Sequence, residues 1–548
     1  MKKHVNSVRF IKHHFLALSF SFFFLFPVEI IPVAAIADSA QYSGIVVDPR
    51  GFPVDKATVR LQGTSFSALT DATGFFKIRS DKAVGAKQIT AWKEGYYNGG
   101  TAMPAAGTEC SLLITPIPRE DNTAYAWLPA LATTLPDGQT ETKPCQQCHA
   151  ELTEQWRRSS HANSAINPLF LAFFDGTDGN GTPGAGPSYK LDFPNSNGNC
   201  ATCHVPAMAL KNPFNSDPRE ARGVEKEGVS CDLCHKIDQA GVDSGGGHPG
   251  TLSLRLRRPA EGHQLFYGPY DDVFPGEDSY HPIYRESRYC APCHHGKFWN
   301  VLMYSEFSEW AASTYARNNV HCQDCHMGAD GSQTHFAPEK EGGVERRPET
   351  IPTHGFNGVQ DRALMTAAID LGLEVELKED DLRVTATIKN LKAGHHYPTG
   401  NPMRHMILLV EARGEDGGTL ALVGGERVPA WGGKGPVEQG NYAGFPGKGF
   451  AKVLRETTSY PDGRGRRHFQ PEYPAPHWRP ALIESDNRIP ANGADISQFN
   501  FHVPAELRGS IRVMGRLLFR RSYKKWLDSK GLATNDLELA CQSQVIGR

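Results

Sequence analysis

The sequence has no excess of charge of either sign. Lys and Arg together number 58 and Asp and Glu together number 60, which gives a formal net charge of −2 at pH 7. A protein that binds nucleic acid carries a surplus of basic residues to meet the phosphate backbone. The charge balance therefore argues against that class.

Long apolar runs are missing beyond the first residues. An apolar stretch over 15–26 follows a basic start, and residues 35–37 (Ala-Ile-Ala) offer a small-residue cleavage site, which is the pattern of a signal peptide. A membrane anchor is disfavoured because Pro27 and Pro32 interrupt the stretch before it reaches spanning length. We expect residues 1–37 to be a signal peptide. The mature chain is then exported, to the periplasm or the extracellular cell surface, without spanning a membrane.

Segments with the period of a long helix are scarce as well, whereas cysteine and histidine are not. The 55 Gly and 38 Pro favour loops and turns. Ten of the 12 Cys fall into five copies of C-x-x-C-H. The copies comprise Cys145, Cys148 and His149; Cys200, Cys203 and His204; Cys231, Cys234 and His235; Cys290, Cys293 and His294; and Cys322, Cys325 and His326.

The C-x-x-C-H motif is typical of covalently attached c-type heme. The two thiols add to the vinyl groups of the porphyrin, and the histidine that follows becomes the proximal ligand of the iron. Structural zinc, disulfides and thioredoxin-like redox pairs also use paired cysteines, but none of them needs a histidine directly after each pair. We therefore predict five covalent heme c groups, attached through the ten motif cysteines, with iron bound by the five motif histidines.

The gaps between successive motifs alternate between long and short. The short gaps predict two close heme pairs, the second motif with the third and the fourth with the fifth. Since residues 145–326 would hold five macrocycles, the porphyrins themselves must form much of the core of this region.

The regions on either side of the motifs are predicted to be β-structure. Short strands over 41–118 are separated by Gly, Pro and Asp turns. Residues 44–54 and 70–76 resemble the carboxypeptidase regulatory-like, transthyretin-like β-sandwich, whose modules are usually structural or adhesive. Alternating apolar residues after about 368 predict a second β-sandwich with a short helix near 523–530.

The predicted fold class is therefore multidomain. It comprises an all-β sandwich over 38–118, a pentaheme cytochrome domain of short helices and loops over 119–360, and an all-β sandwich over 361–548.

Residues 143–420 resemble the secreted multiheme c-type cytochromes related to the tetraheme cytochromes that carry electrons in nitrification. The matching elements are Trp156 with Ser160, His161 and Ala162; Gly228, Val229 and Ser230; residues 267–270 with His281; residues 354–358; and residues 394–400. The resemblance implies an electron carrier whose partners are other redox proteins or cytochromes. It does not identify a particular partner.

Four histidines in these family-like elements are predicted to be second axial ligands, namely His161, His281, His354 and His395. The fifth ligand stays open among His248, His263, His295, His335 and His396, with His248 and His295 preferred, or else the fifth iron is five-coordinate. His395 lies in the predicted C-terminal sandwich, so ligation by His395 would join that domain to the heme region.

The two remaining cysteines, Cys110 and Cys541, are either a disulfide or two separate thiols.

Electron transfer through five hemes, in extracytoplasmic respiration or extracellular electron transport, is the leading functional hypothesis. Self-association into a filament or a surface assembly is one arrangement that would serve it. The alternative is an oxidoreductase for nitrite, hydroxylamine or sulfur oxyanions with one open heme. No C-x-x-C-K motif occurs, which separates the chain from the usual pentaheme nitrite reductases, so we predict a carrier and no catalytic residues.

Overall fold

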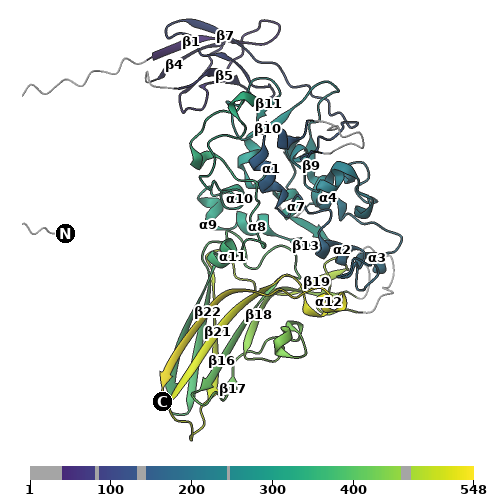
Figure 1. The fold of residues 1–548 in the computed structure, drawn as a ribbon, viewed down its shortest axis with the longest axis vertical. Coiled ribbons are helices and arrows are strands. Elements are labelled where there is room, and N and C mark those ends of the chain that lie inside the picture. The colour runs from purple at the N-terminus through teal and green to yellow at the C-terminus, as the bar shows by residue number, and fades with distance from the viewer. Residues whose placement is uncertain (1–39, 81–84, 133–142, 243–246, 458–470) are drawn as a thin grey trace, which may run out of the picture.

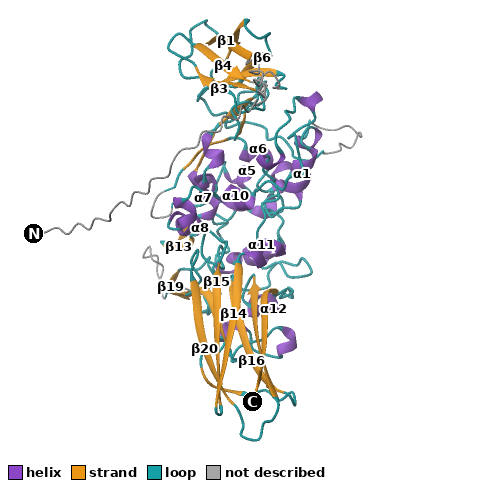
Figure 2. Ribbon diagram, turned by 90° about the vertical axis from the view of Figure 1, so that its left-hand side faces the viewer, coloured by secondary structure: helices purple, strands orange, loops and turns teal. Residues whose placement is uncertain are grey.

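The computed structural model describes residues 40–80, 85–132, 143–242, 247–457 and 471–548. They form an elongated molecule with β-sheets at both ends and short helices between them (Figures 1 and 2). This confirms the multidomain fold at that level, while the exact domain boundaries stay predictions. The predicted signal peptide over 1–37 lies outside the described residues. No helix in the described ranges is long and apolar enough to cross a membrane.

The N-terminal module consists of two sheets on one core. One sheet has the order β4 (Phe75–Ser80), β1 (Ala40–Val47), β7 (Glu109–Leu113), and the other has the order β3 (Ser67–Leu69), β2 (Thr58–Leu61), β5 (Gln88–Trp92), β6 (Gly99–Ala102). Exposed and buried residues alternate along β4, because successive side chains of a strand point to opposite faces. Phe76 and Ile78 thereby enter a core with Val59, Ile89 and Leu112. The resemblance of this module to the carboxypeptidase regulatory-like family stays a prediction.

The middle region is built from short helices and two-stranded ribbons. The helices are α1 (Ala150–Arg157), α2 (Pro168–Phe174), α3 (Tyr189–Asp192), α4 (Ala201–His204), α5 (Pro206–Ala209), α6 (Cys231–Cys234), α7 (Ala291–His294), α8 (Glu306–Ala311), α9 (Thr314–Arg317), α10 (Cys322–His326) and α11 (Arg362–Ala367). The ribbons pair β8 (Ile237–Ala240) with β9 (Leu254–Leu256), β10 (Phe266–Gly268) with β11 (Asp278–Tyr280), and β12 (Gly296–Phe298) with β13 (Val301–Tyr304). Helices of one or two turns are marginal by themselves, so the surroundings must hold them.

The C-terminal domain also consists of two sheets on one core. The first has the order β14 (Ile369–Lys378), β15 (Asp381–Asn390), β20 (Ala494–His502), β17 (Ala421–Gly424), and the second has the order β19 (Ala481–Asp486), β18 (Gly447–Glu456), β16 (His405–Gly414), β21 (Ser510–Arg520), β22 (Leu537–Gly547). Buried Leu382, Val384, Ala386 and Ile388 alternate along β15 and join the core. The predicted strands and the predicted short helix, α12 (Lys524–Ser529), are present.

Cys110 and Cys541 do not form a disulfide. Both thiols are free, and they lie in β7 and β22 at opposite ends of the molecule (Figure 1). The disulfide alternative is therefore wrong.

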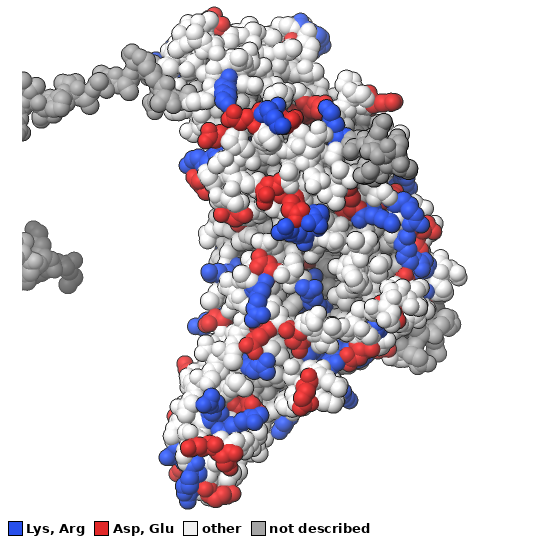
Figure 3. Space-filling view, in the orientation of Figure 1, with Lys and Arg blue, Asp and Glu red and all other residues white. Residues whose placement is uncertain are grey.

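Buried charges join the N-terminal module to the middle region. Arg60 of β2 forms a bidentate contact with Asp271 at 2.7 and 2.9 Å. Asp272 accepts hydrogen bonds from the backbone N–H of Gly63 at 2.8 Å and from Arg346 at 2.7 Å. Acidic and basic side chains interleave where the two parts meet (Figure 3). Because Asp272 is only 2% exposed, its charge depends on these partners.

We expect Asp272→Ala to loosen the N-terminal module. Removing one partner of a buried ion pair costs about 3–5 kcal/mol, because Arg346 keeps its charge without its counter-ion. Lys87→Ala is the matched control. Lys87 also reaches the middle region, through Glu339 at 2.8 Å, but the two side chains are 72% and 56% exposed, so the cost should be at most about 1 kcal/mol. Thermal unfolding and limited proteolysis measure the difference, and equal effects of the two variants would contradict the prediction.

Candidate functional site

The five motif histidines share one arrangement, in which Nδ1 of the ring faces an acceptor from another segment. The contacts are His149 to the Phe336 carbonyl at 3.0 Å, His204 to the Ser164 carbonyl at 3.1 Å, His235 to the Tyr267 carbonyl at 2.6 Å, His326 to the Asn357 carbonyl at 2.5 Å, and His294 to Oε1 of Glu306 at 3.5 Å. An Nδ1–H donated to an acceptor fixes the tautomer and leaves the lone pair on Nε2 for a metal. The motif rings are therefore prepared to bind iron through Nε2.

Three of the four supporting carbonyls, those of Ser164, Tyr267 and Asn357, lie in or next to elements that carry the family resemblance. Tyr267 opens the 267–270 element, and its N–H also donates to the His235 carbonyl at 2.9 Å. Asn357 lies in the 354–358 element, and its N–H donates to the His326 carbonyl at 3.1 Å. These elements thus hold motif histidines at two points each, although they are distant in sequence.

Two predicted axial ligands face motif histidines at a specific spacing. The ring centres of His161 and His294 are 6.4 Å apart, and those of His395 and His326 are 6.3 Å apart with planes at 12°. A metal–imidazole bond is about 2 Å long, and the centre of the imidazole ring lies about 1 Å beyond the bonded nitrogen. The ring centres of two axial imidazoles on one iron are therefore about 6 Å apart. Each pair of rings therefore has the spacing that fits one heme iron between its two members. His161 thus faces the fourth motif rather than the first, which precedes it in sequence.

A glycine allows His161 to be held in place. Gly228 has a φ of 63°, and a Cβ there would lie 2.2 Å from Oγ of Ser164. This close approach lets the N–H of Val229 donate to the His161 carbonyl at 3.1 Å. Burial, with a smaller contribution from His294, lowers the pKa of His161 to about 3. The ring is therefore neutral at physiological pH, as a metal ligand must be.

His354 lies near the third motif. Its backbone N–H donates to Gln155 at 2.8 Å. Phe356 packs against two of the predicted ligands. Its ring centre lies 6.0 Å from that of His354 and 4.3 Å from that of His161. Burial, followed by the nearby His235, lowers the pKa of His354 to about 3. His354 is thus a neutral ring close to His235.

His281 has different neighbours. Its Nε2 lies 4.0 Å from Asp238, its ring centre lies 5.1 Å from that of Tyr267, and its Nδ1 accepts a hydrogen bond from the N–H of Ile283 at 3.3 Å. An Nδ1 that accepts a hydrogen bond is the reverse of the arrangement in the motif histidines. In the described ranges no motif ring contacts His281.

The open candidates for a fifth ligand lie elsewhere. His248 is exposed and contacts Phe214, whereas His295 is buried against Phe307. His335 lies near Glu339 and His396 near Glu309. None of these contacts is to a motif ring.

One histidine that the sequence interpretation missed, His477, lies near the second motif. Burial, followed by His204, lowers the pKa of His477 to about 4. The signal available in the sequence was the run 474–478, Pro-Ala-Pro-His-Trp, which does not follow a strand pattern. It lies far from every motif, so nothing in the spacing pointed to it.

Motif cysteines contact one another across the chain. The thiol contacts are Cys145 with Cys231, Cys203 with Cys293, and Cys290 with Cys322. The fourth and fifth motifs are thus adjacent, as the short gap between them predicts. The second motif contacts the fourth and the third contacts the first, which the spacing did not predict.

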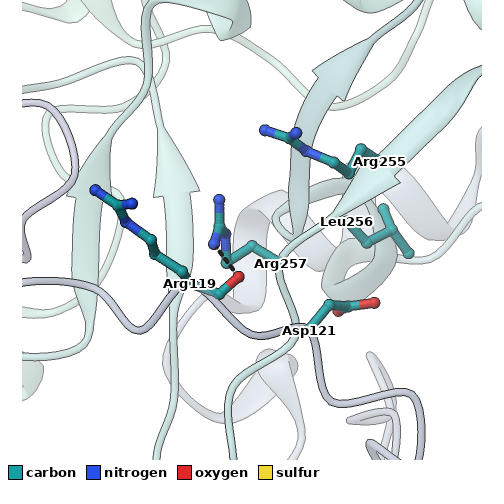
Figure 4. Close-up of a pocket in the computed structure, with 5 residues that line it drawn as sticks. All are labelled: Arg119, Asp121, Arg255, Leu256 and Arg257. Carbon is teal, nitrogen blue, oxygen red and sulfur yellow. Dashed lines mark hydrogen bonds between the residues drawn. The ribbon is translucent and has the colours of Figure 1, made fainter.

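A pocket of about 400 Å³ lies outside this network. It is lined by Arg119, Asp121, Arg255, Leu256 and Arg257 (Figure 4). Arg255 and Arg257 already pair with Asp238 at 2.6 and 3.2 Å. Its charges are thus largely satisfied within the chain, and no motif residue lines it.

Residues 144–236 match the family model described as cytochrome c554 and c-prime. This range holds the first three motifs, and the match supports a multiheme c-type cytochrome. No curated protein matches the chain.

Among solved structures, the chain is similar to a penta-heme cytochrome c552 from Thermochromatium tepidum, with 20% identity and a TM-score of 0.49 over 73% of this chain and 97% of that one. It is also similar to a type II cohesin–X-dockerin complex from Acetivibrio cellulolyticus, with 25% identity and a TM-score of 0.13 over 14% of this chain and 58% of that one.

We expect Gly228→Ala, which disturbs the backbone that holds His161, to lower the free energy of unfolding more than a Gly→Ala change at an uncrowded turn. A left-handed backbone costs alanine about 1–2 kcal/mol, and at Gly228 the added Cβ also collides with Ser164. Gly262→Ala is the control, since its φ is +81° and nothing lies within 4 Å of its added Cβ. Chemical unfolding should show the larger loss of stability for Gly228→Ala, and equal losses would refute the role of close packing.

Proposed function

We propose that the chain carries electrons through five covalently attached c-type hemes. The observation that carries the proposal is the spacing of His161 from His294 and of His395 from His326, since two imidazole rings whose centres are about 6 Å apart match the two axial ligands of one iron. Iron bound by two histidines suits electron transfer rather than substrate binding.

In this proposal, each group of residues has a separate role in holding the hemes. The ten motif cysteines attach the porphyrins, and the motif histidines supply one imidazole each. His161 and His395 supply the second imidazole at the fourth and fifth motifs, and His354 does so at the third. Bound heme supplies the redox chemistry, while the chain fixes distance, ligation and solvent exposure. His248, His281 and His295 have no place in this assignment.

Export supports the same function. Covalent c-type heme and the predicted signal peptide over 1–37 both suit a protein of the periplasm or the cell surface, with other redox proteins as partners. Self-association into a filament would extend the conducting path.

One observation favours the alternative function. His149 is exposed, and the described residues show no ring contact between it and a second histidine, although His354 lies close enough for the charges of the two rings to interact. A heme open on one side there could bind nitrite, hydroxylamine or a sulfur oxyanion. Electron paramagnetic resonance of the oxidised protein separates the two functions. Low-spin signals alone support a carrier, and a high-spin signal that shifts with one of these substrates supports an enzyme.

We expect His161→Ala and His395→Ala each to convert one heme from low spin to high spin without loss of covalent heme. Each change removes one axial imidazole and leaves the cysteines intact. Visible absorption and electron paramagnetic resonance measure the spin state. His502→Ala, an exposed histidine at the end of β20, is the control. Unchanged spectra in both variants would refute the ligand assignment.

We expect Glu306→Gln to raise the midpoint potential of one heme. In the described chain, Glu306 is the one carboxylate that faces Nδ1 of a motif histidine. The other four motif histidines face backbone carbonyls instead. A carboxylate acceptor makes the imidazole a stronger donor, which stabilises the oxidised iron. Spectroelectrochemical titration measures the potentials, with Glu376→Gln in an exposed ion pair as the control. A titration curve that superimposes on the wild type would contradict the expectation.

A further inference from the structure

Residues 477–479 fasten the C-terminal domain to the middle region. Asp192, the last residue of α3, accepts a hydrogen bond from Nε1 of Trp478 at 2.7 Å and two from Arg479 at 2.6 and 2.8 Å. Arg479 also pairs with Glu456 at 2.7 Å. The side chains of Arg479, Asp192 and Glu456 are all at most 5% exposed. A buried bidentate pair of this kind fixes geometry tightly.

The same junction leads to the second motif. Phe170 of α2 stacks on the His204 ring at 3.7 Å and 4°. Phe173, on the same helix, packs against Trp478 with ring centres 5.7 Å apart. One short helix therefore contacts both the motif histidine and the residue that follows His477.

Tyr304 also connects His477 with the second motif. The ring of Tyr304 lies 6.3 Å from that of His477, and Tyr304 is close enough to Cys203 and Cys200 for a charge on either thiol to affect its hydroxyl. Tyr304 is thus a neighbour of His477 and lies near the attachment cysteines of the second motif.

We propose that His477 is the second axial ligand at the second motif, opposite His204. The inference rests on the proposed function, because it needs heme attached at Cys200 and Cys203. Nδ1 of His477 lies 3.4 Å from the side-chain amide nitrogen of Asn401, and whichever way that amide is turned, Nε2 is the nitrogen left for the iron. The C-terminal domain then holds the heme region at two points, His395 and His477.

The test uses the full-length, heme-loaded protein. In His477→Ala, one heme of five should become high spin in the oxidised state, and added imidazole should restore the low-spin signal. In Asp192→Asn, the weakened support should give a partial loss of the same low-spin signal. His502→Ala, which removes an exposed histidine of the same domain, should leave the spectra unchanged.

Each outcome decides the proposal. Low-spin spectra in His477→Ala that match the wild type would overturn it. If the alanine variant does not accumulate, His477→Met is measured instead, and a thioether-to-iron absorption band would support ligation while its absence with five low-spin hemes would refute it. A wild-type protein without covalent heme would instead overturn the proposed function itself, so the two failures are distinguishable.

Discussion

The fold depends on the need of each motif imidazole for a fixed acceptor at Nδ1. A heme attached by two flexible thioether links is not oriented by those links alone, and its proximal histidine must be held in one tautomer and one direction. Single-turn helices such as α4, α6, α7 and α10 cannot provide that rigidity. The chain therefore brings remote backbone to each ring, from Phe336 to His149 and from Asn357 to His326. The loops of the middle region follow from this requirement.

The C-terminal domain belongs to the same system. Its own core of Leu382, Val384 and their neighbours does not need the hemes, yet the edge that faces the motifs carries His395, the 477–479 run and the buried pair of Arg488 with Glu309 at 2.7 Å. Two β-sheets provide a stiffer platform for distant ligands than a loop of the same length. The N-terminal module is attached differently, through Asp271 and Asp272 to a loop that holds no motif, so it adds a surface rather than a ligand.

The sequence predicts the strands well because alternation is a local pattern, and the C-x-x-C-H motif, whose covalent attachment stays a prediction, is equally local. The C-x-x-C-H motif is complete within five residues, and the alternation of apolar residues along β15 is visible in the sequence of that strand alone. The sequence does not predict which histidine rings come together, because that depends on the tertiary path of the chain. His161 lies twelve residues after His149 in the chain, yet its ring faces His294. His281 matches a family-like element, yet it lies against Asp238, and His477 matches none, yet it lies near His204. Periodicity and spacing carry no information on such contacts.

The cysteine contacts give this set of motifs a branched order rather than a line. The fourth motif touches the second through Cys293 and Cys203 and the fifth through Cys290 and Cys322, and its cysteines also lie near Cys234 of the third. In the described part of the chain, the first motif has a thiol contact with the third motif alone, through Cys145 and Cys231. In the proposed carrier, heme held at the fourth motif would therefore have neighbours at the second, third and fifth motifs. The fourth is also the motif whose histidine faces a carboxylate, Glu306, which is half-buried and whose pKa is held below the usual value by His294. A charge placed beside the fourth motif would therefore lie near more of the other motifs than the same charge placed beside the first. Glu306 thus lies beside the motif that has the most neighbouring motifs in the described part of the chain.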